Sequence, residues 1–240
     1  MEFLLVLCFL LGANSYTFVE YEMGLTEFPP VPSNSLKVNV SMNAITYLGP
    51  NIMFNCAHLS EFVAKNNLIH DVDPLAFNGT VISALYMTNN KLTTVPTLRV
   101  IADTLEFLGL IGNQIDDLTA LRDLTKLVKV FLGRNMVSTV DPNVFDKLIH
   151  LENIYLTMNR ITTLNWATSL TPPVTFNFNL KGNPVLEYCT CYLLHILQSL
   201  HSKVNIVGTC MNPSGNEIST GDFVAAAVCS ATEYSQKDPE

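Results

Sequence analysis

Cysteines are the residues whose type and spacing most directly suggest chemistry in this chain. Four of its six cysteines lie near the C-terminus, at Cys189, Cys191, Cys210 and Cys229. Four thiolates could hold zinc, but such sites usually combine closely spaced pairs, whereas here a C-x-C pair precedes two widely separated cysteines. We therefore expect disulfide bonds, for which four cysteines allow three connectivities.

Histidines and aspartates are the remaining candidates for catalysis or metal binding. The five histidines contain no metal-binding spacing such as H-E-x-x-H, and no nucleophile elbow is present. Asp71-Val72-Asp73 and Asp116-Asp117 could suggest calcium, but both fall at turns of a repeat, and we interpret them as solvated turn residues. We expect no catalytic residue, no metal and no cofactor, and hence a protein that is not an enzyme.

The first 15 residues have the features of a signal peptide. The apolar run Phe3–Leu11 is too short to span a bilayer, and the small residues Ala13 and Ser15 suit cleavage before Tyr16. The segment departs from the usual pattern because it has Glu2 and no Lys or Arg, so a buried N-terminal strand is the alternative. We expect a secreted, extracellular protein with no membrane span, since residues 231–240 are a polar tail.

The net charge limits the possible partners, and two sequons fit the secretory route. The net charge is −8 without a basic cluster, so nucleic acid and anionic membranes are poor partners. The sequons Asn39-Val40-Ser41 and Asn78-Gly79-Thr80 make Asn39 and Asn78 candidate glycosylation sites.

An internal repeat determines the expected fold. The pattern L-x-x-L-x-L-x-x-N-x-L recurs about seven times between residues 35 and 184, and its asparagines are spaced by 24, 23, 23, 22, 24 and 24 residues. These asparagines are Asn43, Asn67, Asn90, Asn113, Asn135, Asn159 and Asn183. Alternation in L-x-L predicts a short strand with one buried face, and stacked strands would form a parallel sheet. Each asparagine leaves the strand at a turn, where its amide can satisfy backbone groups of both kinds.

The pattern resembles that of extracellular leucine-rich-repeat proteins, from about Gly24 to Cys229. This resemblance implies an α/β solenoid, or horseshoe, with a parallel β-sheet on its concave face. Residues 185–230 resemble the cysteine-rich C-terminal flanking module of such proteins. The module implies the pairings Cys189–Cys210 and Cys191–Cys229, and a short helix over Tyr192–Leu200 that covers the last repeat.

Two further resemblances concern the ends of the repeat array. Residues 24–29 are similar to the end of an N-terminal flanking module, yet residues 16–34 contain no cysteine. Either this segment is a cap without disulfides, or the end is frayed or covered by a partner. The C-terminal cap is also similar, more weakly, to arthropod repeat proteins that include the non-catalytic subunit of a shrimp luciferase.

Aromatic residues on the outer arc are expected in the core. Phe77 and Phe145 follow matching V-D-P segments, and Phe54 is assigned the equivalent place one repeat before Phe77. Cys56, which lies three residues before Leu59, is expected to be a small buried hydrophobe, with a reactive thiol as the alternative.

Binding is expected on the concave face, which displays the variable strand positions. The middle row of that face is Asn39, Val63, Tyr86, Gly109, Phe131, Tyr155 and Asn179. The row before it is Lys37, Glu61, Ala84, Phe107, Lys129, Asn153 and Asn177. The row after it is Ser41, Lys65, Thr88, Ile111, Gly133, Thr157 and Lys181. Tyr86, Phe107, Ile111, Phe131 and Tyr155 form an apolar centre with a polar frame, which is typical of an interface. Strand propensity alone is the alternative reason for aromatics there.

The sequence thus predicts a module that binds an extracellular protein ligand, in recognition, adhesion or matrix assembly. A glycan on Asn39 would cover the N-terminal third of the concave face and direct the ligand to the central and C-terminal repeats. The alternative function is a non-catalytic subunit that stabilises a secreted enzyme. A carrier of small apolar ligands is a third interpretation, but an open sheet encloses no cavity.

Overall fold

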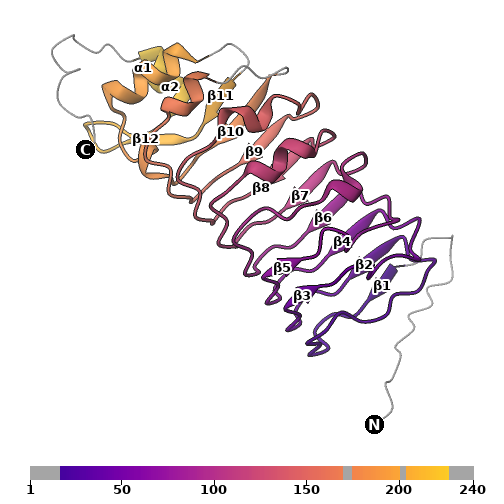
Figure 1. Ribbon diagram of the computed structural model, residues 1–240. Helices are drawn as coiled ribbons and strands as arrows, with labels where there is room; N and C mark the ends of the chain where they lie inside the picture. The colour runs from indigo at the N-terminus through magenta and orange to yellow at the C-terminus, as the bar shows by residue number, and fades with distance from the viewer. Residues whose placement is uncertain (1–16, 170–174, 201–203, 227–240) are drawn as a thin grey trace.

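Short parallel strands stacked into one sheet form the body of the protein. A computed structural model describes residues 17–169, 175–200 and 204–226 (Figure 1). The nine-stranded sheet has the order β1-β2-β4-β6-β7-β8-β9-β10-β11, and every pairing in it is parallel. Its strands are β1 (Thr17–Val19), β2 (Lys37–Asn39), β4 (Glu61–Val63), β6 (Ala84–Tyr86), β7 (Phe107–Gly109), β8 (Lys129–Phe131), β9 (Asn153–Tyr155), β10 (Phe176–Asn179) and β11 (Val204–Val207).

Smaller elements return the chain from one strand to the next. A second parallel pair, β3 (Tyr47–Leu48) with β5 (Asp71–Val72), lies in the outer arc of the first coils. Later coils use 3-10 helices there, at Arg99–Ile101, Thr119–Asp123, Pro142–Phe145 and Asn165–Ser169, and a further 3-10 helix, Pro184–Leu186, directly follows Asn183. The helices α1 (Cys191–Ser199) and α2 (Thr220–Ala226) and the hairpin of β12 (Thr209–Met211) and β13 (Glu217–Ser219) lie at the C-terminal end of the stack (Figure 1). None of the helices in the described ranges is long and apolar enough to cross a membrane.

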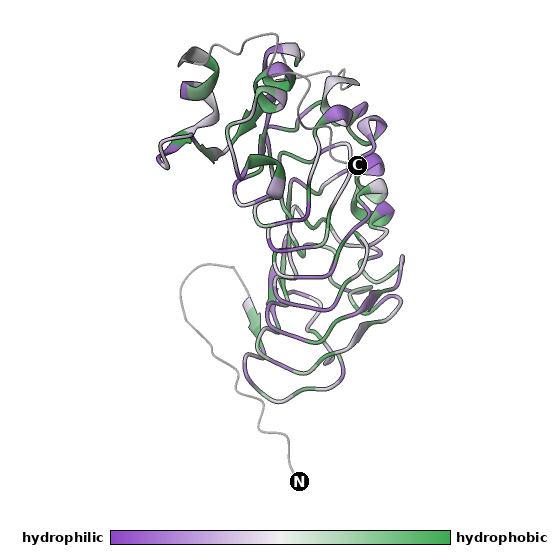
Figure 2. Ribbon diagram, turned by 90° about the vertical axis from the view of Figure 1, so that its left-hand side faces the viewer, coloured by the Kyte–Doolittle hydropathy of each residue, from purple (hydrophilic) through white to green (hydrophobic). Residues whose placement is uncertain are grey.

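The core runs through the whole stack. Successive side chains of a strand point to opposite faces, so the middle residue of each strand points inward. Val38, Phe62, Leu85, Leu108, Val130 and Ile154 are all 0% exposed. Hydrophobic and hydrophilic residues therefore alternate along the coils (Figure 2). Each coil buries its apolar face only against its neighbours, so the coils depend on one another for stability.

An asparagine ladder joins the coils where each strand ends. Six of the seven motif asparagines are between 2% and 7% exposed: Asn67, Asn90, Asn113, Asn135, Asn159 and Asn183. Each of the six accepts a backbone N–H bond from the preceding coil and donates to a carbonyl of that coil, as Asn159 does with Val137 and Leu132. The residue before each motif asparagine has a positive φ, for example 54° at Met158 and 70° at Gly112. This left-handed residue turns the chain off the strand.

Phe54 does not belong to the core, so the position assigned to it is wrong. Phe77 and Phe145 are each 1% exposed, whereas Phe54 is 62% exposed. The register of β3 with β5 explains the difference, because Leu48 pairs with Val72, an offset of 24 residues. The equivalent of Phe77 is then Met53, which is 0% exposed and fills the core in its place. Cys56 is buried at 2% exposure, with a raised pKa caused by that burial.

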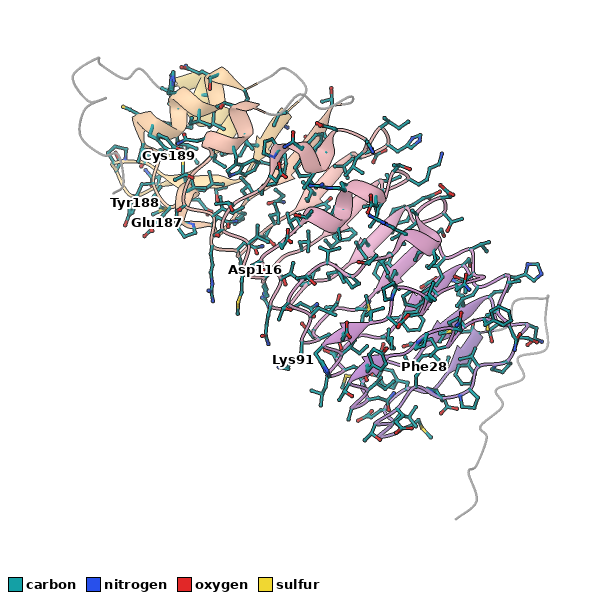
Figure 3. The ribbon with its side chains drawn as sticks, viewed as in Figure 1. Phe28, Lys91, Asp116, Glu187, Tyr188 and Cys189 are labelled. Carbon is teal, nitrogen blue, oxygen red and sulfur yellow. A yellow bond between two sulfur atoms is a disulfide. The ribbon has the colours of Figure 1, made fainter. Side chains whose placement is uncertain are left out.

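The N-terminal end continues the sheet without any disulfide in the described residues. β1 pairs with β2. Phe28, which is labelled in Figure 3, packs against Phe62 at a distance of 6.0 Å between the ring centroids. Asn43 bonds to this segment as the other motif asparagines bond to the preceding coil. Its Oδ1 accepts the N–H of Leu25, and its Nδ2 donates to the carbonyl of Glu20. Among the described strands, β1 is the first of the stack.

The C-terminal end carries the disulfide Cys189–Cys210, the first of the two pairings that the flanking-module resemblance implies (Figure 3). The Thr190 hydroxyl accepts from the N–H of Leu193 and caps α1, which buries Leu193 and Ile196 over the last coil. The sequence placed this helix one residue later than its observed start and did not indicate α2. The pairing Cys191–Cys229, the signal peptide and the polar tail involve residues outside the described ranges.

Candidate binding surface

The predicted apolar patch lies in the middle of the concave face. Phe131 of β8 pairs in register with Tyr155 of β9, and their rings are stacked at 4.8 Å with an interplanar angle of 5°. Gly109 of β7 lies on the other side of Phe131 in the same row. The strand spacing of ~4.8 Å accounts for this stacking, because paired residues of parallel strands project side by side.

Tyr86 occupies the space above the glycine of the next strand. A Cβ atom at Gly109 would lie 2.5 Å from Cδ1 of Tyr86, so the ring leans over that strand. The Nζ of Lys65 lies 5.2 Å from the centroid of the Tyr86 ring. Burial, followed by the negative charge of Glu61, raises the pKa of the Tyr86 hydroxyl. The phenol is therefore neutral at neutral pH and can act as a hydrogen-bond donor.

Each of the five patch residues is half-buried. Phe107 lies in register beside Lys129, and Ile111 lies two residues beyond Gly109 at the end of β7. Each of the five side chains is therefore partly covered by its neighbours and partly open to solvent on neighbouring strands of the sheet. Three positions of the concave rows are buried rather than exposed. Ser41 is only 4% exposed, because its Oγ accepts the N–H of Lys65 in the next coil, and Gly109 and Gly133 are buried as well.

Ion pairs frame the patch. Lys37 and Glu61 lie 2.8 Å apart on neighbouring strands, and Lys129 lies 3.9 Å from Glu152. The hydrogen bond to Glu61, and then its charge, raise the pKa of Lys37. Exposed pairs of this kind contribute little to stability. Their main effect is to make the rim of the patch polar.

A row of asparagines beside the patch was not recognised as a unit from the sequence. Asn153, Asn177 and Asn205 occupy matching positions on β9, β10 and β11. Nδ2 of Asn177 donates to Oδ1 of Asn153 over 3.1 Å, and Nδ2 of Asn205 donates to Oδ1 of Asn177 over 2.8 Å. The first two members were placed in the concave rows, but β11 has no leucine pattern, so its contribution was not visible.

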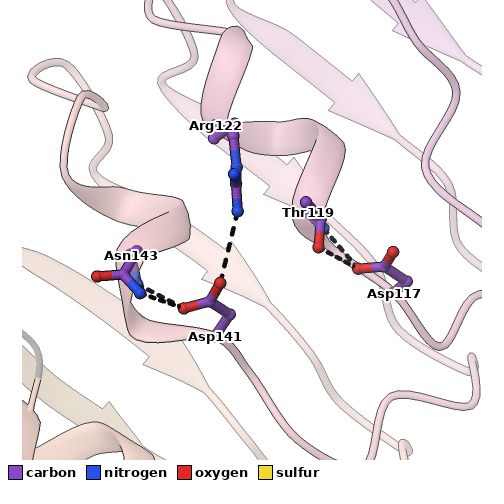
Figure 4. A network of polar contacts seen from close by, with 5 residues as sticks. All are labelled: Asp117, Thr119, Arg122, Asp141 and Asn143. Atoms are coloured by element: carbon purple, nitrogen blue, oxygen red, sulfur yellow. Dashed lines mark hydrogen bonds and ion pairs between the residues drawn. The ribbon is translucent and has the colours of Figure 1, made fainter.

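The paired aspartates serve the turns of the outer arc. Oδ1 of Asp117 accepts from both the N–H and the hydroxyl of Thr119, and Arg122 contacts Asp141 at 3.5 Å (Figure 4). These bonds to Thr119 are the main reason that the pKa of Asp117 is lowered. Within the described ranges, no group of three or more His, Cys, Asp or Glu side chains could hold a metal ion.

The two sequon asparagines lie on different faces. Asn39 is half-buried at the end of β2 on the concave face, and its Oδ1 accepts the N–H of Ser41. Asn78 lies in the outer arc, where its Nδ2 donates to Oδ1 of Asn51. A glycan on Asn39 would therefore reduce access to the first strands of the concave face, and a glycan on Asn78 would not.

Comparisons with known proteins agree with this geometry. The human protein "Leucine-rich repeats and immunoglobulin-like domains protein 3" is 26% identical over 137 residues, which is 56% of this chain and 12% of the relative. "Protein halfway" of Drosophila pseudoobscura pseudoobscura is 32% identical over 103 residues, 39% of this chain and 17% of the relative. The fold is a leucine-rich-repeat solenoid. No protein-family model matches the chain.

The matches therefore span under a fifth of each relative's length. At such identity and coverage, these leucine-rich-repeat similarities indicate a protein-interaction module and no specific activity.

Proposed function

We propose that this leucine-rich-repeat protein is secreted and binds an extracellular protein ligand on its concave face, without being an enzyme. The apolar patch on neighbouring strands carries the proposal. Phe131 stacks on Tyr155, and Tyr86 and Phe107 lie on the two preceding strands. Aromatic residues inside a polar rim are typical of the energetic centre of an interface. Rigid side chains packed against one another also lose little conformational entropy on binding.

Two features of the chain support secretion through an oxidising compartment. The disulfide Cys189–Cys210 closes the C-terminal cap, and such bonds persist mainly outside the cytosol. The apolar run Phe3–Leu11 with small residues before Tyr16 has the features of a secretory signal. Both fit an extracellular ligand.

Capture from native extracellular fluid tests the proposal. The tagged protein is compared with the double variant Phe131→Asp, Tyr155→Asp, which places two charges in the patch. The matched control is Leu75→Asp, Ile149→Asp, since these apolar side chains are 46% and 53% exposed away from the patch. Circular dichroism and gel filtration confirm that all three proteins are folded.

We expect one partner to be retained by the parent and the control and lost by the patch variant. Equal retention by all three proteins would refute the concave patch as the binding surface. If the partner is an enzyme held in a fixed stoichiometry, the role is that of a non-catalytic stabilising subunit. If the partner is a reversible ligand that is not an enzyme, the role is recognition.

A further inference from the structure

The C-terminal strands of the concave face present amides rather than apolar groups. Asn153, Asn177 and Asn205 form a hydrogen-bonded ladder across β9, β10 and β11. Asn179 lies two residues after Asn177 on β10, in register with Tyr155 of β9. Three strands at a spacing of ~4.8 Å give the ladder a length of roughly 10 Å.

The ladder uses only part of its hydrogen-bonding capacity. A carboxamide offers two N–H donors and two acceptor lone pairs. Asn153 donates to none of the described residues, and Asn205, which is exposed, accepts from none of them. Within the described ranges, Asn179 accepts the N–H of Lys181 and its amino group has no partner. Donors and acceptors therefore alternate along an accessible surface.

An aromatic face borders these amides. The Tyr155 ring stacks on Phe131 of β8 with one face. Since β9 lies between β8 and β10, the other face of the ring is turned toward β10 and Asn179. An apolar ring surface thus meets a row of amides along one line of the sheet.

The charge of this region favours a neutral ligand. The first two outward rows of β9, β10 and β11 contain no ionisable group other than the Tyr155 phenol: Asn153, Tyr155, Asn177, Asn179, Asn205 and Val207. The nearest cation of the third row, Lys181, lies 3.4 Å from Glu217. Sites for phosphate or carboxylate groups usually supply Arg or Lys. Beside the ladder, Lys129 of β8 lies in register with Asn153, but its Nζ lies 3.9 Å from Glu152.

We propose that the amide ladder and Tyr155 form a binding site for a neutral oligosaccharide. Neighbouring sugar hydroxyls both donate and accept hydrogen bonds, which matches side chains that offer both groups. The apolar C–H groups of a sugar would contact the solvent-facing edge of the Tyr155 ring, which is half-buried. The inference rests on the proposed function because both place binding on the concave face. The oligosaccharide and the protein ligand would share only Tyr155, and their other contact residues differ.

Calorimetric titration and a glycan array test the site directly. The protein, freed of its own N-glycans, is titrated with laminarihexaose, chitohexaose and a high-mannose N-glycan, with a heparin hexasaccharide as the charged comparison, and the array extends the neutral set. We expect saturable binding of at least one neutral glycan. Asn177→Leu should weaken it about tenfold, which corresponds to the loss of one or two hydrogen bonds.

The controls separate this site from the fold and from the protein ligand. Asn143→Leu changes an exposed asparagine of the outer arc and should leave glycan binding unchanged. Asn205→Ala changes the exposed end of the ladder and replaces Asn177→Leu if that variant does not fold. Failure of every neutral glycan to bind, preference for the charged hexasaccharide, or undiminished binding by the ladder variants would overturn the proposal. Patch-dependent protein capture would then still support the proposed function.

Discussion

The backbone N–H of Ile115 donates to Oδ1 of Asn135 over 2.9 Å, across the boundary between two coils. Nδ2 of the same asparagine donates to the carbonyls of Leu110, in the preceding coil, and of Leu132 in its own. Asn135 is 7% exposed, so water cannot replace these bonds easily. One amide therefore satisfies buried backbone groups of two coils at once and couples their stability.

Replacing Asn135 with alanine should lower the free energy of unfolding by about 3 kcal/mol or more. The substitution leaves a buried N–H and at least one carbonyl without a partner, each at a cost of roughly 1–3 kcal/mol. Urea denaturation followed by circular dichroism measures the loss. Asn143→Ala, in the exposed outer arc, should change stability by no more than about 0.5 kcal/mol. Equal effects of the two variants would show that the ladder does not couple the coils.

The spacing of the motif asparagines predicted the solenoid because each of them bonds to backbone groups of two neighbouring coils, which requires the same place in every repeat. The same reasoning was wrong for Phe54, where the repeat length changes between coils. A register of 24 residues places Met53 at the core position of Phe77, and a flexible methionine fills that space. Pattern matching by residue type therefore fails where a different apolar side chain performs the same packing.

The candidate surface was only partly visible in the sequence. Tyr86, Phe131 and Tyr155 were assigned outward positions by strand alternation, but their mutual packing depends on side-chain direction. The lean of Tyr86 over Gly109 is one example. The amide ladder extends onto β11, which lies in the C-terminal cap and follows no repeat pattern. Contacts between a repeat and a cap arise from tertiary structure, so spacing alone could not predict them.

Removing the disulfide by Cys189→Ala, Cys210→Ala should lower the free energy of unfolding by about 3 kcal/mol. The two residues are separated by 21 positions, and closing a loop of that size restricts the unfolded chain by roughly this amount. Denaturation with and without a reducing agent measures the effect. The reducing agent should destabilise the parent more than the variant, and an equal response of the two would contradict this role.

The thiol of Cys56 should make stability fall at alkaline pH. Burial raises its pKa, so the folded state favours the neutral thiol. This contribution is complete below the thiol pKa of the unfolded chain, about 8.5, and is lost as the pH rises through the higher folded-state pKa. Free energies of unfolding from pH 7 to pH 10 should decline less steeply for Cys56→Ala than for the parent. Parallel curves would mean that the thiol ionises equally in both states.

The hydrogen bonds between Asp117 and Thr119 should make the stability of the protein depend on pH in the acidic range. The hydroxyl and the N–H of Thr119 lower the pKa of this carboxylate, so it stabilises the fold above the unfolded-state pKa. That stabilisation disappears as the pH falls through the lower folded-state pKa. Thr119→Val removes the hydroxyl and should raise the pKa of Asp117 in an NMR titration. The carboxylate of Asp141, which bonds to Asn143 instead, serves as the internal reference.

Phe131 and Tyr155 should be coupled in stability as well as in binding. Their rings stack at 4.8 Å, and aromatic pairs contribute about 0.5–1.5 kcal/mol beyond the area that they bury. A double-mutant cycle with Phe131→Leu and Tyr155→Leu measures this coupling through denaturation. A coupling energy in that range means that the folded protein already holds both rings in place, so a ligand gains contact area without ordering them. A coupling energy near zero would mean that the two rings move independently and that the patch is not rigid.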